Sequence, residues 1–173
     1  MAEEFIIRKA NLNDLDEILE LHFKLSKKIY KKFDKSVNLN WTYTHGKKYF
    51  AGQIKKSDGF VEVAEGGGKI IGYVCGSLVE RPLDREKALY AELESIMVDK
   101  KLRSAGIGSE LIKSFLKWSK PKKVKYISVT ASAKNEKALK LYRNLGFKNY
   151  EMILELDLKK LSRFFKFFRN KNK

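Results

Sequence analysis

A strand, a glycine loop and a helix follow one another directly in the second half of the chain. Residues 88–98 alternate apolar and polar side chains, a pattern that predicts a strand. The loop Arg103–Gly108 carries two glycines, and apolar residues at three- and four-residue spacing from position 107 to 118 predict an amphipathic helix. Consecutive backbone N–H groups at the start of a helix bind anions. The order of these segments therefore predicts a pyrophosphate site at the loop.

Two common nucleotide motifs do not match this loop. A Rossmann fingerprint needs a third glycine where Leu111 stands, and a Walker A loop needs Gly-Lys-Ser/Thr, which is absent. The other glycine cluster, residues 66–68, joins two β-rich runs and predicts a hairpin. No helix follows that cluster, so it is not interpreted as a phosphate loop.

The remaining pattern predicts a single α/β domain over residues 1–157, with strands and helices following one another along the chain. Asn11 or Asn13 is expected to cap a first helix that runs to about Lys32. The other expected elements are a strand at 5–10, a weaker helix at 41–56, strands at 60–64, 70–78 and 124–129, a helix at 134–145, and a last strand at 147–156.

Few residues could hold a metal or form a disulfide. Cys75 is the single cysteine, and His22 and His45 are the two histidines, so neither a disulfide scaffold nor a Cys/His zinc site is expected. His22 is interpreted as a residue at the edge of the core, and Cys75 as a buried strand residue. The acidic N-terminus and the lack of an apolar run of about 18 residues lead us to expect a cytoplasmic protein.

The net charge of +16 is concentrated in the C-terminal segment. Residues 158–173 hold seven basic and no acidic side chains, which leaves +9 for residues 1–157. Leu158, Phe164 and Phe168 fall on one side of a helical wheel, so the segment is expected to be a basic amphipathic helix. It could dock on its own domain or on a dimer mate, bind RNA or DNA, or lie on an anionic membrane surface.

Two motifs together resemble the GNAT acetyltransferase superfamily. Arg103-x-x-Gly106-x-Gly108, after a strand that ends Ile96-Met97-Val98-Asp99, resembles the acetyl-CoA pyrophosphate loop of that family. About 30 residues later, Asn135-x-x-Ala138-x-x-Leu141-Tyr142-x-x-x-Gly146-Phe147 resembles its other hallmark. The resemblance extends over residues 5–157 and implies the GNAT fold, an α/β fold with a mixed central sheet flanked by helices. It also implies acetyl-CoA as cosubstrate and no metal.

The resemblance also implies which residues bind the cosubstrate. Met97 and Val98 would pair their main-chain groups with the pantetheine arm as though it were an added strand, and Asn135 would contact CoA. The pyrophosphate would bind to the backbone amides of Arg103, Ser104, Ala105, Gly106, Ile107, Gly108 and Ser109. Lys100, Lys101 and Lys134 are expected near the nucleotide phosphates.

Catalysis requires a free amine and a protonated leaving group. A lysine amine titrates near pKa ~10.4, so a base is needed at neutral pH. Glu92 is the first candidate for that base and Glu94 the second. The resemblance implies that Tyr142 protonates the departing thiolate, although it could instead be a core aromatic residue. The Val98 N–H is expected to stabilise the oxyanion.

The predicted function is N-acetyl transfer from acetyl-CoA to a primary amine by direct attack, without an acyl-cysteine. A protein or peptide N-terminus or lysine is the first choice of acceptor, and a small-molecule amine or polyamine is the alternative. A non-enzymatic CoA-binding module attached to nucleic acid by its basic segment is the competing hypothesis.

Overall fold

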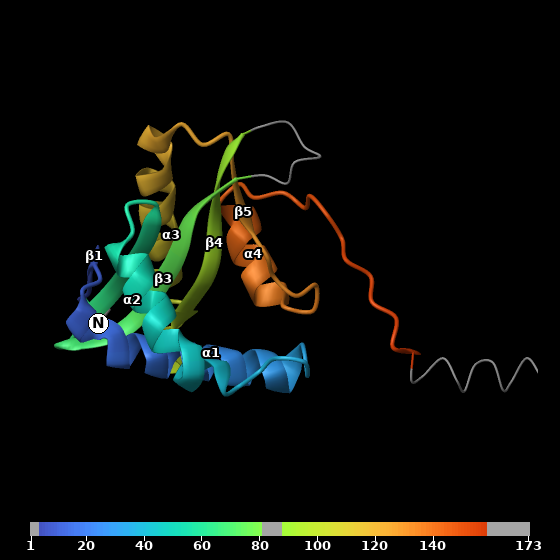
Figure 1. Ribbon diagram of the computed structural model, residues 1–173, viewed down its shortest axis with the longest axis horizontal. Helices are drawn as coiled ribbons and strands as arrows, with labels where there is room; N and C mark the ends of the chain where they lie inside the picture. Colours follow the sequence, from blue (N-terminus) through green and yellow to red (C-terminus); the bar gives the residue numbers. More distant parts are fainter. Residues whose placement is uncertain (1–3, 81–87, 159–173) are drawn as a thin grey trace, which may run out of the picture. The chain divides into compact units, whose positions relative to one another are not determined.

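The computed structural model describes residues 4–80 and 88–158 (Figure 1). Contacts within the chain divide it into two compact units, residues 1–141 and 142–173. The first unit holds all the strands of the sheet and the helices that cover it. The predicted basic helix at 158–173 falls almost entirely outside the described residues.

The sheet has five strands in the order β1-β2-β3-β4-β5. Neighbouring strands are antiparallel except β4 and β5, which are parallel. This mixed sheet confirms the predicted α/β class. The strands are β1 (Ile6–Lys9), β2 (Gly59–Gly66), β3 (Lys69–Glu80), β4 (Leu89–Val98) and β5 (Tyr126–Val129).

The described part of the chain forms four α-helices and four short helical turns. The α-helices are α1 (Leu15–Lys32), α2 (Lys47–Lys55), α3 (Ile107–Ser119) and α4 (Glu136–Asn144). The short turns are η1 (Leu12–Asp14), η2 (Thr42–Gly46), η3 (Lys100–Leu102) and η4 (Lys120–Lys122), of which η2 is a π-helix and the others are 3₁₀-helices.

The first helix begins where the sequence predicts it. The Asn11 side chain accepts a hydrogen bond from the Asn13 N–H at 2.8 Å, and the Asp14 carboxylate accepts one from the Asn11 N–H at 2.7 Å. This capping box belongs to the 3₁₀ turn η1, which continues directly into α1, and it satisfies N–H groups at the start of that turn. Glu17, in the first turn of α1, accepts from the Ile70 N–H at 2.9 Å and so fastens the helix to β3.

Helices α1 and α2 cover one face of the sheet and α3 covers the other (Figure 1). On the first face Phe50 of α2 packs edge-on against Tyr73 of β3, with ring centroids 5.7 Å apart. On the second face Phe60 of β2 meets Phe115 of α3 at 5.2 Å. Each face therefore has its own buried core, and the sheet is buried between them.

A β-bulge interrupts the pairing of β3 with β4. Cys75 lies opposite Ser95 and Gly76 opposite Leu93, so the register skips Glu94. A Cβ atom at Gly76 would lie 2.6 Å from a ring carbon of Phe115 and against the carbonyl oxygen of Glu92. The absence of a side chain at position 76 thus allows α3 and β4 to approach closely at the bulge.

The expected last strand at 147–156 is not formed, and this prediction is wrong. Residues 147–157 have no regular secondary structure, and Met152, Ile153 and Leu154 are between 78% and 86% exposed. Alternating apolar residues show only that a segment could form a strand with one buried face. A strand also requires a neighbouring backbone to pair with, and that partner cannot be read from the alternation.

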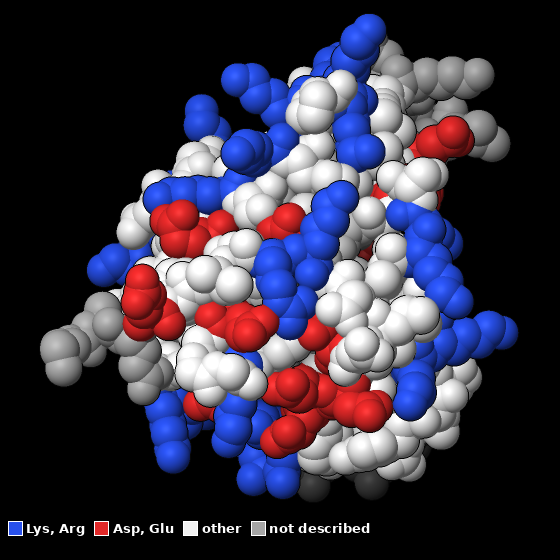
Figure 2. Space-filling view, turned by 90° about the vertical axis from the view of Figure 1, so that its left-hand side faces the viewer, with Lys and Arg blue, Asp and Glu red and all other residues white. Residues whose placement is uncertain are grey.

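Charge is unevenly distributed over the first unit. Figure 2 shows acidic side chains gathered over part of one face, with Lys and Arg around them. Arg8 donates to Asp14 at 2.8 Å and to Glu65 at 2.6 Å, and the Arg8 hydrogen bond holds the pKa of Asp14 below its usual range. This face is not a continuous basic surface, so the net charge does not indicate uniform polyanion binding. Within the described residues, none of the helices combines the length and apolarity needed to cross a bilayer.

Candidate functional site

The end of β4 has an open edge. Strand β5 pairs only with residues 90–93 of β4, whereas β4 continues to Val98. Within the described ranges, no strand lies beside residues 94–98 on the side where β5 would continue. Unpaired N–H and C=O groups along a strand edge can bind an extended chain as if it were another strand.

The pairing with β3 determines which main-chain groups face this open edge. The Asp99 N–H donates to the Ile71 carbonyl at 2.8 Å, and Tyr73 lies opposite Met97. Antiparallel pairs alternate between hydrogen-bonded and non-bonded. The main-chain groups of Met97 therefore point to β3, while those of Ile96 and Val98 point to the open edge. Sequence reasoning named Met97 and Val98 for the pairing with the pantetheine arm. It missed Ile96 and included Met97, whose main-chain groups point to β3, because nothing in the local sequence sets the register.

The loop before α3 has the geometry of an anion cradle. Ser104 and Gly106 both adopt positive φ, +73° and +83°, which turns the chain sharply into the helix at Ile107. In the described part of the chain, no residue accepts a hydrogen bond from the N–H groups of residues 105–108. A Cβ atom at Gly106 would have no neighbour within 4 Å, so the space beside the loop is open. These groups fit a pyrophosphate.

Arg103 lies between this loop and the open edge. Its Nε donates to the Val98 carbonyl oxygen at 3.2 Å, and one Nη lies 3.6 Å from the Met97 sulfur. The guanidinium is therefore folded back along the end of β4, although Arg103 remains exposed.

More cations gather near the loop than the sequence predicts. Burial, followed by the nearby charges of Arg103, Lys32 and Lys137, lowers the pKa of Lys28. The prediction placed Lys100, Lys101 and Lys134 near the nucleotide phosphates and missed Lys28 and Lys137. Lys28 comes from the distant helix α1, so no local motif could have indicated its place.

The two candidate carboxylates have different surroundings. Glu92 is half-buried, and its Cα lies between Ser77 of β3 and Ser128 of β5, where all three strands are paired. Glu94 lies at the bulge, just where β4 and β5 separate. The Ser77 hydroxyl donates to a Glu94 carboxylate oxygen at 2.5 Å, and partial burial raises the pKa of Glu94 while its side chain stays accessible to solvent. A carboxylate of this kind can accept a proton from an incoming amine.

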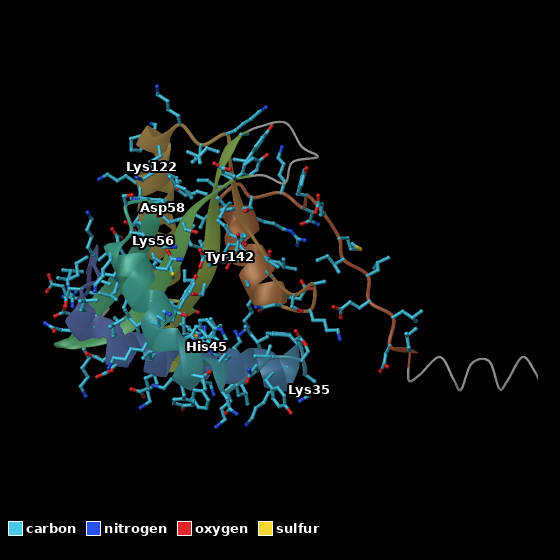
Figure 3. All side chains as sticks on the ribbon, viewed as in Figure 1. Lys35, His45, Lys56, Asp58, Lys122 and Tyr142 are labelled. Carbon is cyan, nitrogen blue, oxygen red and sulfur yellow. The ribbon has the colours of Figure 1, made fainter. Side chains whose placement is uncertain are left out.

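Tyr142 and Asn135 both belong to the segment around α4. Tyr142, labelled in Figure 3, is 8% exposed, and its ring packs against Phe147 at 5.7 Å. Burial raises the pKa of Tyr142 to about 12, so its hydroxyl is protonated at neutral pH. The Asn135 carbonyl accepts hydrogen bonds from Ala138 and Leu139, so Asn135 stands at the start of the helix. Tyr142 is the first residue of the second compact unit.

Cys75 has no features of a nucleophile. It is fully buried in β3, and burial raises the pKa of its thiol to about 12. The reactive thiolate is therefore essentially absent at neutral pH. Over residues 4–80 and 88–158, no three His, Cys, Asp or Glu side chains come together as a metal site would require.

Sequence comparison identifies relatives of this chain. The model of the acetyltransferase (GNAT) family matches residues 18–147. An uncharacterized N-acetyltransferase from Methanocaldococcus jannaschii is 30% identical over 161 residues, which cover 88% of this chain and 65% of that protein. The chain thus spans about two thirds of the length of this curated relative.

Solved structures show the same fold. The BH1408 protein of Bacillus halodurans, in a mutant form, matches with a TM-score of 0.80 and 24% identity, covering 88% of this chain and 98% of that one. An aminoglycoside N-acetyltransferase in complex with CoA matches with a TM-score of 0.67 and 18% identity, covering 91% and 96%. The matched family model spans both the loop before α3 and the segment around α4, and we conclude that the chain belongs to the GNAT acetyltransferase family.

Proposed function

We propose that this protein transfers an acetyl group from acetyl-CoA to a primary amine. The observation that carries the proposal is the open edge of β4, which leads directly to a loop with unpartnered N–H groups at the start of α3. An extended arm that ends in a pyrophosphate matches both features at once. Acetyl-CoA has that shape, and its thioester supplies an activated acetyl group.

Main-chain groups bind the cosubstrate in this proposal. Ile96 and Val98 pair with the pantetheine arm, and the amides of the loop from Arg103 to Ser109 hold the pyrophosphate. The cations around Lys28 add attraction for the phosphates. Asn135 supplies a further contact from the start of α4.

Glu94 acts as the base, with Glu92 as the second candidate. Glu94 accepts a proton from the acceptor ammonium, directly or through water, which leaves the nitrogen lone pair free to attack the thioester carbonyl carbon. The Val98 N–H stabilises the negative charge that forms on the carbonyl oxygen. Tyr142 gives its proton to the sulfur as the carbon–sulfur bond breaks. The position of Glu94 beside the open edge of β4 favours this role over that of Glu92, which lies where β4 is paired on both sides and which the sequence ranked first.

Two classes of acceptor are consistent with this chemistry. The sequence favoured a protein or peptide amine. Structural neighbours named as aminoglycoside acetyltransferases support a small-molecule amine, although at 18–20% identity they share only the fold. The predicted dimer and nucleic-acid partners depend on the basic segment at 158–173 and stay predictions.

A pair of glycine variants tests cosubstrate binding at the loop. Gly106 and Gly67 both have positive φ and room for a methyl group, but Gly67 lies in the turn between β2 and β3. Ala at either position should cost roughly 1–2 kcal/mol of stability, because an L side chain is strained there. Gly106→Ala should also weaken acetyl-CoA binding about tenfold in calorimetry, whereas Gly67→Ala should not. Equal affinities in both variants, or no binding by the wild type, would contradict the proposed site.

The hydrogen bond from Ser77 to Glu94 predicts a shift in the pH profile. This bond favours the charged carboxylate, so removing it in Ser77→Ala should raise the pKa of Glu94 further. The base is active when ionised, so the acidic limb of the kcat/KM profile should move upward by about one pH unit. Ser114→Ala, which removes a similar bond to Glu62, is the matched control and should leave the profile in place. An unchanged profile in Ser77→Ala would remove Glu94 from the mechanism.

A further inference from the structure

Lysines gather in the short segment that joins the end of α3 to β5, which we call the basic corner (residues 117–126). The basic corner contains no acidic side chain, and its lysines are Lys117, Lys120, Lys122, Lys123 and Lys125. All of them are exposed except Lys122, which is half-buried. Figure 2, in which the end of α3 is at the top, shows Lys and Arg side chains gathered there. The basic corner is thus a local concentration of positive charge.

Nearby carboxylates do not neutralise this charge. Lys113, one turn earlier on α3, pairs with Glu110 at 2.8 Å. By contrast, over residues 4–80 and 88–158 no carboxylate forms an ion pair with the amino groups of Lys117, Lys120, Lys122 or Lys123. Like charges held close together repel one another, and a polyanion relieves that repulsion. The basic corner therefore attracts chains of phosphates.

The backbone of the basic corner has the shape of an anion site. Lys123 adopts φ +55° and ψ +30°, directly after the 3₁₀ turn η4. A right-handed residue followed by a left-handed one points successive N–H groups into one concavity, where an anion can bind. In the described part of the chain, the N–H groups of Lys123 and Val124 donate to no group outside this turn. These two groups can therefore hold a phosphate oxygen.

Lysine is an unfavourable choice at position 123. The chain must turn sharply here, because the Lys125 N–H donates to the Leu89 carbonyl of β4 at 2.9 Å. Glycine adopts the left-handed conformation without strain, whereas an L side chain does not. Apart from glycines, Ser104 is the other described residue with a positive φ, and it lies in the loop before α3. Such strain occurs often where a ligand is held, and the turn alone does not explain the lysine.

An exposed aromatic ring adjoins the lysines. Tyr126, the first residue of β5, is 52% exposed, and its ring packs against Tyr90 at 5.4 Å. The Lys125 amino group lies 5.8 Å from the centre of the Tyr126 ring. Trp118 is less accessible, because the Lys122 amino group lies over its ring at 4.7 Å. Bases of single-stranded nucleic acids stack on exposed rings beside basic groups. Tyr126 is placed to receive such a base.

The basic corner lies far from the proposed pyrophosphate loop. Helix α3 begins at Ile107 beside that loop and ends at Ser119, a length of 13 residues. At 1.5 Å per residue the helix separates the two places by roughly 20 Å. Strand pairing agrees, since Tyr126 lies opposite Tyr90 near the start of β4, whereas the loop follows the end of β4. A ligand at the basic corner therefore leaves room for acetyl-CoA at the loop.

We propose that the basic corner binds single-stranded nucleic acid. The lysine amino groups and the N–H groups of Lys123 and Val124 hold phosphates, and a base stacks on Tyr126. An anionic membrane fits less well, because a segment that lies on a membrane inserts large apolar side chains, and Tyr126 is the exposed large hydrophobic residue of the basic corner. This interaction is separate from the proposed acetyl transfer and does not depend on it.

The test measures binding of the full chain to a fluorescein-labelled oligouridylate of about 12 nucleotides by fluorescence anisotropy. Each phosphate contact with a single strand contributes about 0.7 to the slope of log K against log salt concentration. Replacing Lys117, Lys120 and Lys123 by glutamine should therefore lower that slope by about 2 and weaken binding roughly 100-fold at about 0.1 M salt. The affinity for acetyl-CoA, measured by calorimetry, should stay unchanged.

The matched control replaces three exposed lysines elsewhere by glutamine, namely Lys9, Lys48 and Lys69. This variant has the same net charge and should bind the oligouridylate nearly as the wild type does. Equal losses in the two triple variants would show that net charge alone governs binding. That result, an unchanged affinity in the first variant, or displacement of the oligouridylate by acetyl-CoA would overturn the inference.

Two single substitutions separate the contributions of the ring and of the strained lysine. Tyr126→Leu should weaken oligouridylate binding about tenfold and leave binding of inorganic polyphosphate unchanged, because polyphosphate has no base to stack. Lys123→Gly relieves the backbone strain, so it should raise Tm while weakening oligouridylate binding about fivefold at about 0.1 M salt. Wild-type affinity in Lys123→Gly, or equal losses of both ligands in folded Tyr126→Leu, would contradict the inference.

Discussion

Glu94→Gln is expected to lower kcat/KM for acetyl transfer by about 10²–10⁴-fold at neutral pH, the range typical for loss of a general base. Glutamine has the same size and can still accept the hydrogen bond from Ser77, so the bulge should be preserved. The amide cannot accept the proton of the acceptor ammonium. Steady-state rates at saturating acetyl-CoA, measured from pH 6 to 10, test this expectation.

The loss should shrink as the pH approaches the pKa of the acceptor, because an amine that is already neutral needs no base. Glu92→Gln is the matched variant on the same strand and should cost much less at every pH. A larger loss in Glu92→Gln would assign the base to Glu92, as the sequence first indicated. If both variants retain nearly full activity, neither carboxylate is the base.

Gly76→Ala is expected to have the largest effect on stability. The added methyl group would collide with the Phe115 ring and with the Glu92 carbonyl, and the latter is main chain that cannot rotate away. Overpacking of this kind costs about 3 kcal/mol. For a chain of this size that corresponds to a fall of roughly 6–12 °C in Tm. Thermal unfolding followed by circular dichroism measures the effect.

Gly52→Ala is the control for this substitution. Gly52 lies within α2, and a Cβ atom there would meet nothing within 4 Å. Alanine has the higher helix propensity, so Gly52→Ala should raise the free energy of unfolding by about 0.5–1 kcal/mol. Gly76→Ala should additionally lose activity at temperatures where it is folded, since position 76 adjoins the bulge that presents Glu94. A stable, fully active Gly76→Ala would show that the bulge does not depend on the glycine.

Features determined by neighbouring residues could be predicted from the sequence. Asn11 caps the 3₁₀ turn η1 that leads into α1, Gly67 and Gly68 form the turn between β2 and β3, and Gly106 turns the chain into α3. In each case the signal and the structure lie within a few residues of one another. The order of the strands and helices and the loop motif followed from such local signals, whereas the mixed sheet was implied by the resemblance to the GNAT family.

Features that depend on distant contacts could not be predicted. The bulge at Glu94 arises because Gly76 packs beneath Phe115, and two-residue alternation therefore fails at that point. The outward orientation of the Ile96 main chain also depends on a distant contact, the register of β4 with β3. The π-helical turn η2 packs Gly46 against Leu19 of the distant helix α1, and neither histidine spacing nor hydrophobic period predicts such a turn.

The fold-back of Arg103 has a consequence for solubility. An exposed strand edge such as residues 94–98 of β4 invites pairing with strands of other molecules, which is a common route to aggregation. Arg103 places a positive charge at the end of this edge and occupies the Val98 carbonyl oxygen. Charge at an edge strand is a general defence against such pairing. Arg103, the first residue of the loop before α3, therefore also hinders pairing of this edge with other molecules when no ligand covers it.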